Sequence, residues 1–551
     1  MATKRYYCKL ITHYLQLMIK KLASFILVLI ALNSSAQTPN LAFPYSFETD
    51  HKLSRDIYNR NTRIHSSLKP LFLDDSLLRR SADSLFTYGI DSTRLSWVYR
   101  KIFNEHLIEV KKADYTAFID FLPDFQIGRD LSDNNTTWLN TRGFQAGGTI
   151  GEKFSFYTSG FENQGKFARY YTEYIDDREV VPGQSYDRSF GRKEVKDWSY
   201  VTALISYTPI KYLNITIGQD KTFIGDGYRS MILSDQASNY PFIRLTGNLG
   251  NVQYMAMWTA MQDPSAPRLS SDISHRKKGG VFHYLDWNVT DRLSIGFFDA
   301  IIWGQKDDEG NNRGFDWSYA NPIIFLRPLE AASGSPDNAV LGFTGKYEAF
   351  SNIAFYGQFM LDEFRAQEFF KGDGYHGNKF GIQLGLRGFD AFKIRNLNFL
   401  SEFNTARPFM YSGRTAVLNY GHYNEALAHP LGGNFREMLG KMNYSYKRWQ
   451  LMAQANYAQY GLDEAGENNG KNIFVPYSTR NGSYGHTTAQ GLKTDLTFLN
   501  GRVAYLINPK TNLRFELGGI LRQEKNLLVT NNTSLLTFGL RSTFRNIYQD
   551  L

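Results

Sequence analysis

The strongest constraint on the fold is an alternation of apolar with polar, small or charged residues that runs from about 119 to 544. The segment 513–519 reads LRFELGG, with leucine and phenylalanine at one parity and arginine and glutamate at the other. Successive side chains of a β-strand point to opposite faces. A transmembrane barrel strand needs this pattern, because one face meets lipid and the other faces the lumen. The barrel must close, since an open edge in hydrocarbon leaves backbone groups unpaired.

The connections between these segments alternate between short turns and long polar stretches. The short turns lie at 151–152, 209–211, 290–292, 350–351 and 508–511, and the long stretches at 163–198, 220–240, 262–278, 305–338, 405–432 and 461–490. Short periplasmic turns and long external loops are typical of outer-membrane barrels. A soluble β-sandwich or propeller is the alternative, but it explains this rhythm less well.

The alternation predicts about 18 antiparallel strands, within two. They are expected near 119–130, 140–150, 153–162, 199–208, 211–219, 241–247, 251–261, 279–289, 292–304, 339–349, 351–363, 377–388, 396–404, 433–446, 449–460, 491–507, 512–523 and 534–545. An even number suits a barrel with both ends in the periplasm. The predicted fold class is therefore an all-β transmembrane barrel over residues 116–551, in the cell outer membrane.

Composition excludes three other classes. A mean hydropathy of −0.39 and 21% charged residues exclude a polytopic helical membrane protein. An aromatic content of 15% argues against disorder, which needs few aromatic residues and a high net charge. The single cysteine, Cys8, has no partner for a disulfide scaffold.

Residues 1–36 have the order of a secretory signal peptide. Two lysines precede the apolar run LASFILVLIAL, and Asn-Ser-Ser-Ala follows it. Met18 opens this segment well and is a possible true start; a retained N-terminal anchor is the alternative. Removal of residues 1–36 takes away five basic residues and no acidic ones, which lowers the formal net charge from +9 to +4. A nucleic-acid partner, which needs a clustered basic face, is therefore not expected.

Residues 37–115 are expected to form a small N-terminal helical region in the periplasm. Apolar residues recur at three- and four-residue spacing in 75–88 and 95–110, the period of amphipathic helices. Such a region can cap the barrel by packing, or it can bind a partner; the sequence favours packing.

The search for an enzyme site gives almost nothing. The chain has no HExxH, CxxC, Walker or GxSxG motif, so no catalytic residue, metal site or cofactor is predicted. His422 and His429 share one predicted external loop, and a barrel hydrolase would need them to converge with an aspartate or serine. Histidines in such loops are usually only solvated, so the chain is not predicted to be an enzyme.

The densest polar feature is the run 218–235, with three glycines and six candidate residues: Asp220, Lys221, Asp226, Tyr228, Arg229 and Asp235. One interpretation is a loop that folds into the lumen and is held there by ion pairs. The other is a glycan site, in which Tyr228 stacks on a sugar and the charges bind hydroxyls or uronates. The residues alone favour the luminal loop.

A second compact stretch, 317–330, is too rich in proline and apolar residues to be a free loop. Its candidate structural residues are Asn321, Pro322, Arg327 and Glu330. We expect it to pack inside the barrel or across its mouth.

These two stretches carry a family resemblance. The run GxDKxFIGDGYRSxxLSD at 218–235, followed by YANPIxFxRPxE at 319–330 and by Asp337-Asn338, resembles the Wzi-type capsule-assembly outer-membrane barrels. It is most similar to the RemB-type gliding motility proteins related to them. The resemblance implies an 18-stranded barrel with a periplasmic helical part. It also implies a role in attaching capsular polysaccharide or in gliding motility, with surface polysaccharide and gliding-machinery or adhesin proteins as partners.

The sequence therefore predicts a non-enzymatic outer-membrane barrel, in contact with outer-membrane lipid, that acts in gliding motility or in polysaccharide attachment. A channel for oligosaccharide or nutrient uptake is the alternative. The two differ in the lumen, because a filled lumen prevents diffusion and an open, charged constriction supports it.

Overall fold

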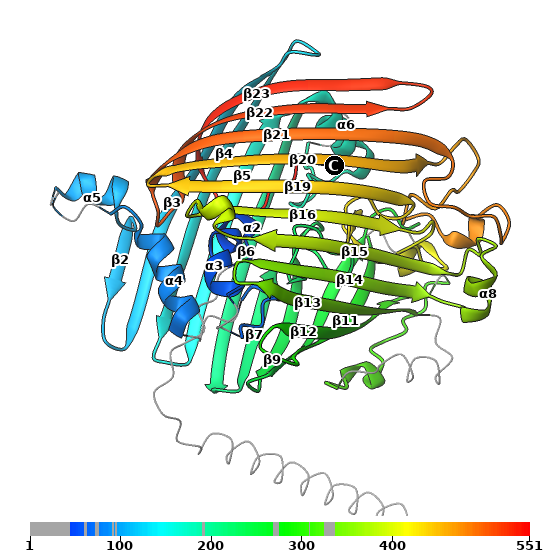
Figure 1. The fold of residues 1–551 in the computed structure, drawn as a ribbon, viewed down its shortest axis with the longest axis horizontal. Helices are drawn as coiled ribbons and strands as arrows, with labels where there is room; N and C mark the ends of the chain where they lie inside the picture. Colours follow the sequence, from blue (N-terminus) through cyan, green and yellow to red (C-terminus); the bar gives the residue numbers. More distant parts are fainter. Residues whose placement is uncertain are drawn as a thin grey trace, which may run out of the picture.

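The computed structural model describes residues 44–59, 63–71, 76–90, 93, 96–189, 193–267, 275–307, 309–323 and 337–551, so the expected signal peptide lies outside it. The described chain forms a closed barrel of 18 antiparallel strands (Figure 1). The strands are β3 (Tyr115–Asp130), β4 (Asn135–Ile150), β5 (Phe154–Lys166), β6 (Val195–Ile210), β7 (Leu213–Asp220), β9 (Tyr240–Asn248), β10 (Val252–Asp263), β11 (Arg276–Asn288), β12 (Leu293–Gly304), β13 (Asn338–Phe350), β14 (Ile353–Glu363), β15 (Lys379–Gly388), β16 (Leu397–Ala406), β19 (Phe435–Tyr446), β20 (Trp449–Leu462), β21 (Leu492–Asn508), β22 (Leu513–Lys525) and β23 (Thr530–Ser542). The predicted fold class is confirmed.

The barrel closes between its last and first strands. Residues 535–540 of β23 pair antiparallel with residues 125–130 of β3. The other half of β3 pairs, along the same edge, with the short strand β2 (Ile108–Lys111). This closure satisfies the backbone groups that an open edge would leave unpaired in the membrane.

The two faces of the wall differ as the alternation predicts. On β22, Phe515 and Leu517 point outward and are 48% and 58% exposed. Arg514 and Glu516 point inward, are buried, and form an ion pair of 3.0 Å between Nε and Oε2. An apolar outer face on a closed barrel is the arrangement that lipid requires. The protein is therefore an outer-membrane β-barrel.

Short turns gather at one end of the barrel and long loops at the other (Figure 1). The long loops contain α6 (Arg169–Arg178), η1 (Trp317–Ala320), α8 (Ala366–Lys371), η3 (Ala416–Leu418), β17 (Gly421–His422), β18 (Glu425–Ala426) and η4 (Tyr477–Thr479), and one short turn contains η2 (Ala391–Lys393). In bacterial outer-membrane barrels the short turns are periplasmic and the long loops extracellular.

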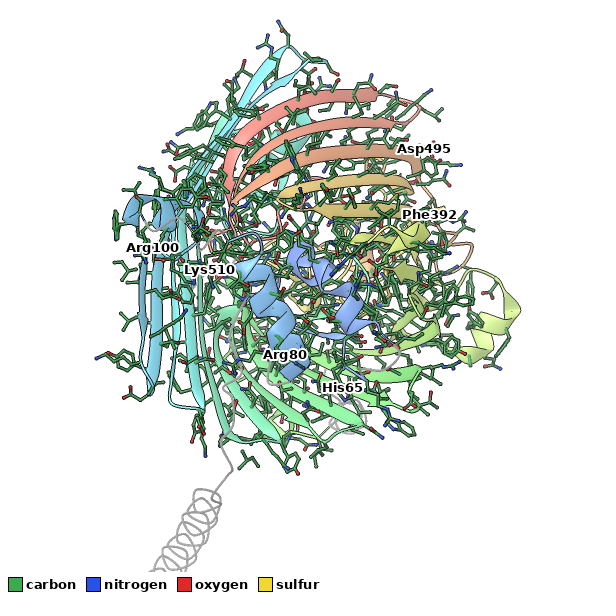
Figure 2. All side chains as sticks on the ribbon, turned by 60° about the vertical axis from the view of Figure 1, so that its left-hand side comes forward. His65, Arg80, Arg100, Phe392, Asp495 and Lys510 are labelled. Carbon is green, nitrogen blue, oxygen red and sulfur yellow. The ribbon has the colours of Figure 1, made fainter. Side chains whose placement is uncertain are left out.

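The N-terminal helices divide between the lumen and the periplasmic end. Helices α2 (Phe47–Lys52) and α3 (Ser54–Ile57) lie inside the ring of strands, whereas α4 (Ser76–Thr87) and α5 (Trp97–Phe103) lie at the short-turn end (Figures 1 and 2). Strand β1 (Leu68–Lys69) pairs inside the barrel with β8 (Phe223–Ile224). No helix among the described residues combines the length and the apolar character needed to cross a membrane.

Part of the inner wall of the barrel is apolar and buried rather than polar and hydrated. Met255 and Met257 of β10, Phe282 of β11 and Phe298 of β12 point inward and are fully buried. They belong to one core with the buried luminal residues 231–233. Interior packing of this kind excludes water from the middle of the barrel.

The segment 317–330 was expected inside the barrel or across its mouth, but its described residues, 317–323, cover the outer wall. Trp258 pairs with Val281 on the outward face of β10 and β11, and its indole nitrogen donates to the carbonyl of Tyr319 at 2.8 Å. The hydroxyl of Tyr254, on the same face, donates to the carbonyl of Pro322 at 2.8 Å. The expected location was therefore wrong. The reason is that β11 and β12 carry bulky apolar side chains on both faces, so the outer face also needs cover.

Two of the four candidate residues of this segment can be placed. The Asn321 side-chain oxygen accepts from the backbone nitrogen of Ile323 at 3.1 Å and so shapes the turn after η1. Pro322 supplies the carbonyl that contacts the wall. Arg327 and Glu330 lie outside the described residues.

Candidate functional site

The run nominated from the sequence is the connection between β7 and β9. We call residues 221–239 the luminal loop. The loop enters the barrel, and every residue in it is buried. It is held by the N-terminal segment, by the inner wall and by the last residues of the chain, as described below.

Asp226 binds the N-terminal segment. Its Oδ1 accepts from the hydroxyls of Tyr58 at 3.0 Å and Ser66 at 2.5 Å, and its Oδ2 accepts from Ser67 at 2.7 Å. Arg387 of β15 donates to the Asp226 carbonyl at 2.6 Å and to the Tyr58 hydroxyl at 2.7 Å. The carboxylate thus ties the N-terminal segment to the loop.

Arg229 and Tyr228 bind the last residues of the chain and the wall. One guanidinium nitrogen of Arg229 lies 3.1 Å from Glu437 Oε1 and 2.9 Å from Asp550 Oδ2. The Tyr228 hydroxyl donates to the other oxygen of Asp550 at 3.2 Å. The backbone nitrogen of Tyr228 donates to Glu402. All of these side chains are buried, so charges that would be costly alone are paired.

The other three nominated residues lie near the extracellular side of the same loop. The Lys221 ammonium donates to the carbonyls of Gly183 at 2.5 Å and Asp235 at 2.7 Å, and burial lowers its pKa. The Asp235 carboxylate accepts from the Tyr548 hydroxyl at 2.5 Å. Asp220 is the last residue of β7 and is also buried.

The structure therefore buries all six nominated residues in the lumen and places five of them, all but Asp220, in the contacts described above. This geometry is that of a packed luminal loop. A direct glycan contact through these residues stays a prediction.

The two loop histidines do not converge with a catalytic partner. The His422 ring nitrogens contact the Gln262 backbone nitrogen at 3.0 Å and the Asn239 carbonyl at 3.3 Å, and burial lowers the pKa of His422 to about 3. His429 contacts Glu437 at 2.8 Å. Among the described residues, no group of three or more His, Cys, Asp and Glu residues could hold a metal ion.

One buried carboxyl in this region gives a pH prediction. Glu425 of β18 accepts from the backbone nitrogen of Gly183 at 3.0 and 3.1 Å, and burial raises its pKa from 4.5 to about 7. A raised folded pKa stabilises the fold below pH 4.5, and this contribution is lost as the pH rises through 7. In urea unfolding, Glu425→Gln should match the parent at pH 4, which is below the unfolded pKa. At pH 8 it should exceed the parent by up to about 3 kcal/mol.

The control for this experiment is Glu464→Gln, which changes an exposed carboxyl of a neighbouring loop. Its difference from the parent should not depend on pH. A Glu425→Gln difference that stays constant from pH 4 to pH 8 would refute the assignment.

The extracellular loops form a second candidate site, which sequence reasoning missed. Loops 364–378 and 463–491 exchange three backbone hydrogen bonds: His376 N to Ser483 O at 2.9 Å, Gly485 N to Asp373 O at 2.8 Å and His486 N to Gly374 O at 3.0 Å. Gly374 has a φ of 75°, and a Cβ there would lie 2.7 Å from the His486 nitrogen, so the junction requires glycine. The two loops thus form one ordered unit.

Three tyrosines on this unit form what we call the tyrosine patch: Tyr375, Tyr477 and Tyr484. The rings of Tyr375 and Tyr484 lie 5.5 Å apart, and Tyr484 is 54% exposed. The Arg365 guanidinium lies 5.3 Å from the Tyr375 ring. The Lys379 ammonium lies 4.2 Å from the Tyr477 ring, but it is buried and ion-paired with Asp362 and Glu363. The exposed Tyr484 ring can stack on a sugar ring, and the exposed Arg365 can bind an acidic substituent. The only sequence signal is the expected external loop 461–490, because the partner loop lies about a hundred residues earlier.

The comparisons with known proteins agree with the fold. No family model and no curated protein sequence matches the chain. The structure is similar to that of Wzi, an outer-membrane protein involved in group 1 capsule assembly in Escherichia coli and described as a carbohydrate-binding β-barrel. The TM-score is 0.55 at 11% identity, over 92% of this chain and 100% of that one. It also aligns with the outer-membrane protein OprD of Pseudomonas aeruginosa, with a TM-score of 0.41 at 10% identity, over 78% and 94%.

At 11% identity the likeness to Wzi shows only that the fold is similar. The alignment with OprD has a lower TM-score. The wall, its apolar outer face and this likeness together give one conclusion. The chain is an 18-stranded outer-membrane β-barrel with a fold similar to that of Wzi.

Proposed function

We propose that this protein is a non-enzymatic barrel that holds a surface polysaccharide at its extracellular loops. The observation that carries the proposal is the tyrosine patch: an exposed aromatic ring, Tyr484, on a unit that two loops make rigid through backbone hydrogen bonds. A preformed surface binds with little loss of conformational entropy. The description of Wzi as a carbohydrate-binding barrel supports the same reading.

The sequence resemblance to the RemB-type proteins extends this proposal to gliding motility. A barrel that grips a polysaccharide outside and is anchored in the membrane can transmit force between the cell and the surface. Adhesins or other motility proteins are the partners that this role requires.

The channel alternative is less well supported. The luminal loop, the N-terminal segment and the inner wall share one apolar core, and residues 231–233 in its middle are fully buried. An apolar core of this kind closes the part of the lumen that it fills to a polar solute. A hydrolase is also not favoured, because the ring nitrogens of His422 contact backbone groups and not an aspartate or serine side chain.

Tyr484→Ala should weaken binding of capsular polysaccharide purified from the source cells by about tenfold, the effect expected for one lost aromatic contact. Binding is measured by isothermal titration calorimetry on the refolded protein in detergent. The barrel should remain folded, because the Tyr484 ring projects from the loop into solvent.

The matched control is Trp317→Ala, since Trp317 is an 81% exposed aromatic residue outside the patch. It should bind like the parent. If Tyr484→Ala bound normally while Tyr228→Ala did not, the luminal residues would carry the contact and the patch would not.

A further inference from the structure

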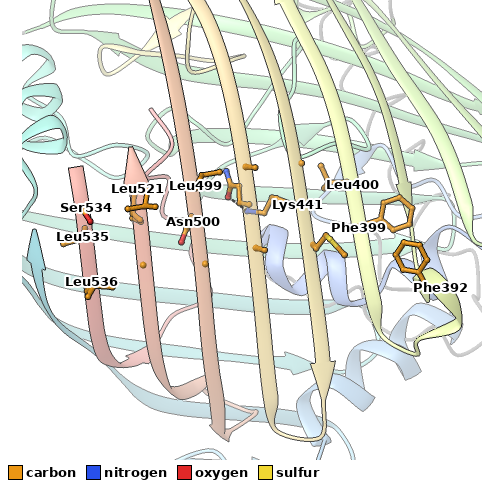
Figure 3. Close-up of a pocket in the computed structure, with 18 residues that line it drawn as sticks. Phe392, Phe399, Leu400, Lys441, Leu499, Asn500, Leu521, Ser534, Leu535 and Leu536 are labelled. Carbon is orange, nitrogen blue, oxygen red and sulfur yellow. Dashed lines mark hydrogen bonds between the residues drawn. The ribbon is translucent and has the colours of Figure 1, made fainter. Parts of the chain in front are cut away.

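One apolar cavity of the described chain lies on the outside of the wall. A groove of about 880 Å³ crosses the outer face of strands β16 and β19–β23 (Figure 3). It runs from Phe392 and Phe399 at one end to Leu521 and Leu536 at the other. Its volume falls within the range of about 300–1,000 Å³ that is typical of small-molecule sites.

The groove exists because outward-facing positions on four adjacent strands carry almost no side chain. These are Gly440 on β19, Ala453 and Ala455 on β20, Gly501 on β21 and Gly519 on β22. They follow one another through strand pairing: Gly440 opposite Ala455, Ala453 opposite Gly501, and Gly501 opposite Gly519. The depression is therefore continuous, and from β19 to β23 it extends over about 19 Å.

The position of the groove along the barrel wall shows which leaflet of the outer membrane it faces. Phe392, which is 85% exposed, belongs to the short turn between β15 and β16 at the periplasmic end. At the same level Trp449 and Tyr505 stack edge to face at 5.1 Å, as in an interfacial aromatic girdle. The groove thus opens at the inner surface of the outer membrane and extends into the hydrocarbon.

The charge at this opening is positive. Lys393 and Arg395 flank Phe392 in the same turn, and Lys447 lies in the next short turn; all three are exposed. The one acidic residue of these two turns, Asp390, is ion-paired with Arg55. Basic residues at a membrane surface attract anionic lipid headgroups.

We propose that this groove binds an anionic glycerophospholipid of the inner leaflet. One acyl chain fills the groove along the glycine and alanine positions, and the headgroup phosphate contacts Lys393 and Arg395. Apolar burial retains the chain, and the basic turn selects the charge. The site differs from ordinary boundary lipid in having both a shaped apolar recess and a charged end.

Native mass spectrometry of the folded protein with added phosphatidylglycerol tests the proposal. The parent should retain one lipid. Gly501→Leu places a side chain in the groove, and nothing lies within 4 Å of a Cβ at this position. It should lower the lipid-bound fraction about tenfold, the effect of about two methylene groups expelled from the groove.

The matched control is Gly345→Leu on β13, which also has nothing within 4 Å of its Cβ and lies outside the groove. It should retain lipid like the parent. Lys393→Gln with Arg395→Gln should abolish the preference for phosphatidylglycerol over phosphatidylethanolamine while keeping some lipid bound.

Three outcomes would overturn the proposal: equal retention by Gly501→Leu and the parent, no retained lipid in either, or equal retention of both lipids by the parent. A dimer that Gly501→Leu converts to a monomer would also overturn it, and would assign the groove to a second copy of the chain.

Discussion

Arg229→Met is expected to destabilise the luminal network by about 3–5 kcal/mol, the range measured when one partner of a buried ion pair is removed. The guanidinium lies between Glu437 and Asp550, and all three side chains are buried. Methionine fills most of the volume but leaves both carboxylates without their cation. Hydrogen exchange of residues 221–239 in the folded protein should rise accordingly, because these amides exchange when the loop opens locally.

A surface arginine provides the control. Arg188 contacts Glu162 at 2.7 Å and Asp197 at 2.6 Å, but its side chain is 46% exposed. Arg188→Met should therefore cost only about 0–1 kcal/mol. Adding Glu437→Gln to Arg229→Met should recover part of the loss, since it removes one of the stranded charges. Equal protection of residues 221–239 in Arg229→Met and the parent would show that the ion pairs do not hold the loop.

The barrel itself could be predicted from the sequence, because lipid outside and protein inside impose a period of two on every strand. All eighteen expected strands occur. The one expected at 512–523 is β22, Leu513–Lys525, and the one expected at 351–363 is β14, Ile353–Glu363. Their ends differ by a few residues, since alternation marks the part of a strand within the membrane and not where pairing stops.

The packing on the barrel was harder to predict, as the segment around Tyr319 shows. The stretch 297–304 reads FFDAIIWG, and such a nearly continuous apolar run is typical of a strand covered on both faces. That signal could have placed the covering segment outside. The inside location was instead expected from the proline and apolar content of 317–330 alone.

The contacts at both candidate sites join residues that are distant in sequence. Asp226 accepts hydrogen bonds from Ser66 and Ser67, which lie about 160 positions earlier in the sequence. Small polar residues show no periodic pattern from which these contacts could be predicted. The tyrosine patch depends on Gly374 and Gly485 bringing two loops together. The polar clusters could be located from the sequence. Their contact partners could not, because closure of the barrel brings those residues together.

The largest change is expected in ion conduction. The parent protein, refolded and placed in a planar bilayer, should give no steady single-channel current. Its luminal loop contributes residues 231–233 to a core that includes inward side chains of β10, β11 and β12. A pore requires a continuous hydrated path, and this core interrupts it.

Deleting the luminal loop should open that path. Asp220 and Tyr240 are paired across β7 and β9, so residues 221–239 can be replaced by an Asn-Gly turn that closes a two-residue hairpin. The shortened protein should give discrete, steady current steps. Heat-modifiable gel mobility must show that both proteins are folded, because silence from an unfolded barrel carries no information.

The two results together separate the proposed functions. Current from the intact protein would mean that the luminal core opens in the membrane, and the uptake channel would replace the adhesive barrel. Silence from the intact protein with current from the shortened one would show that the wall can conduct and that the loop prevents it. Silence from both, with both folded, would assign the block to the N-terminal segment, whose Tyr58 and Ser66 share the Asp226 network. The lumen then serves as a packed support, and recognition is left to the extracellular loops.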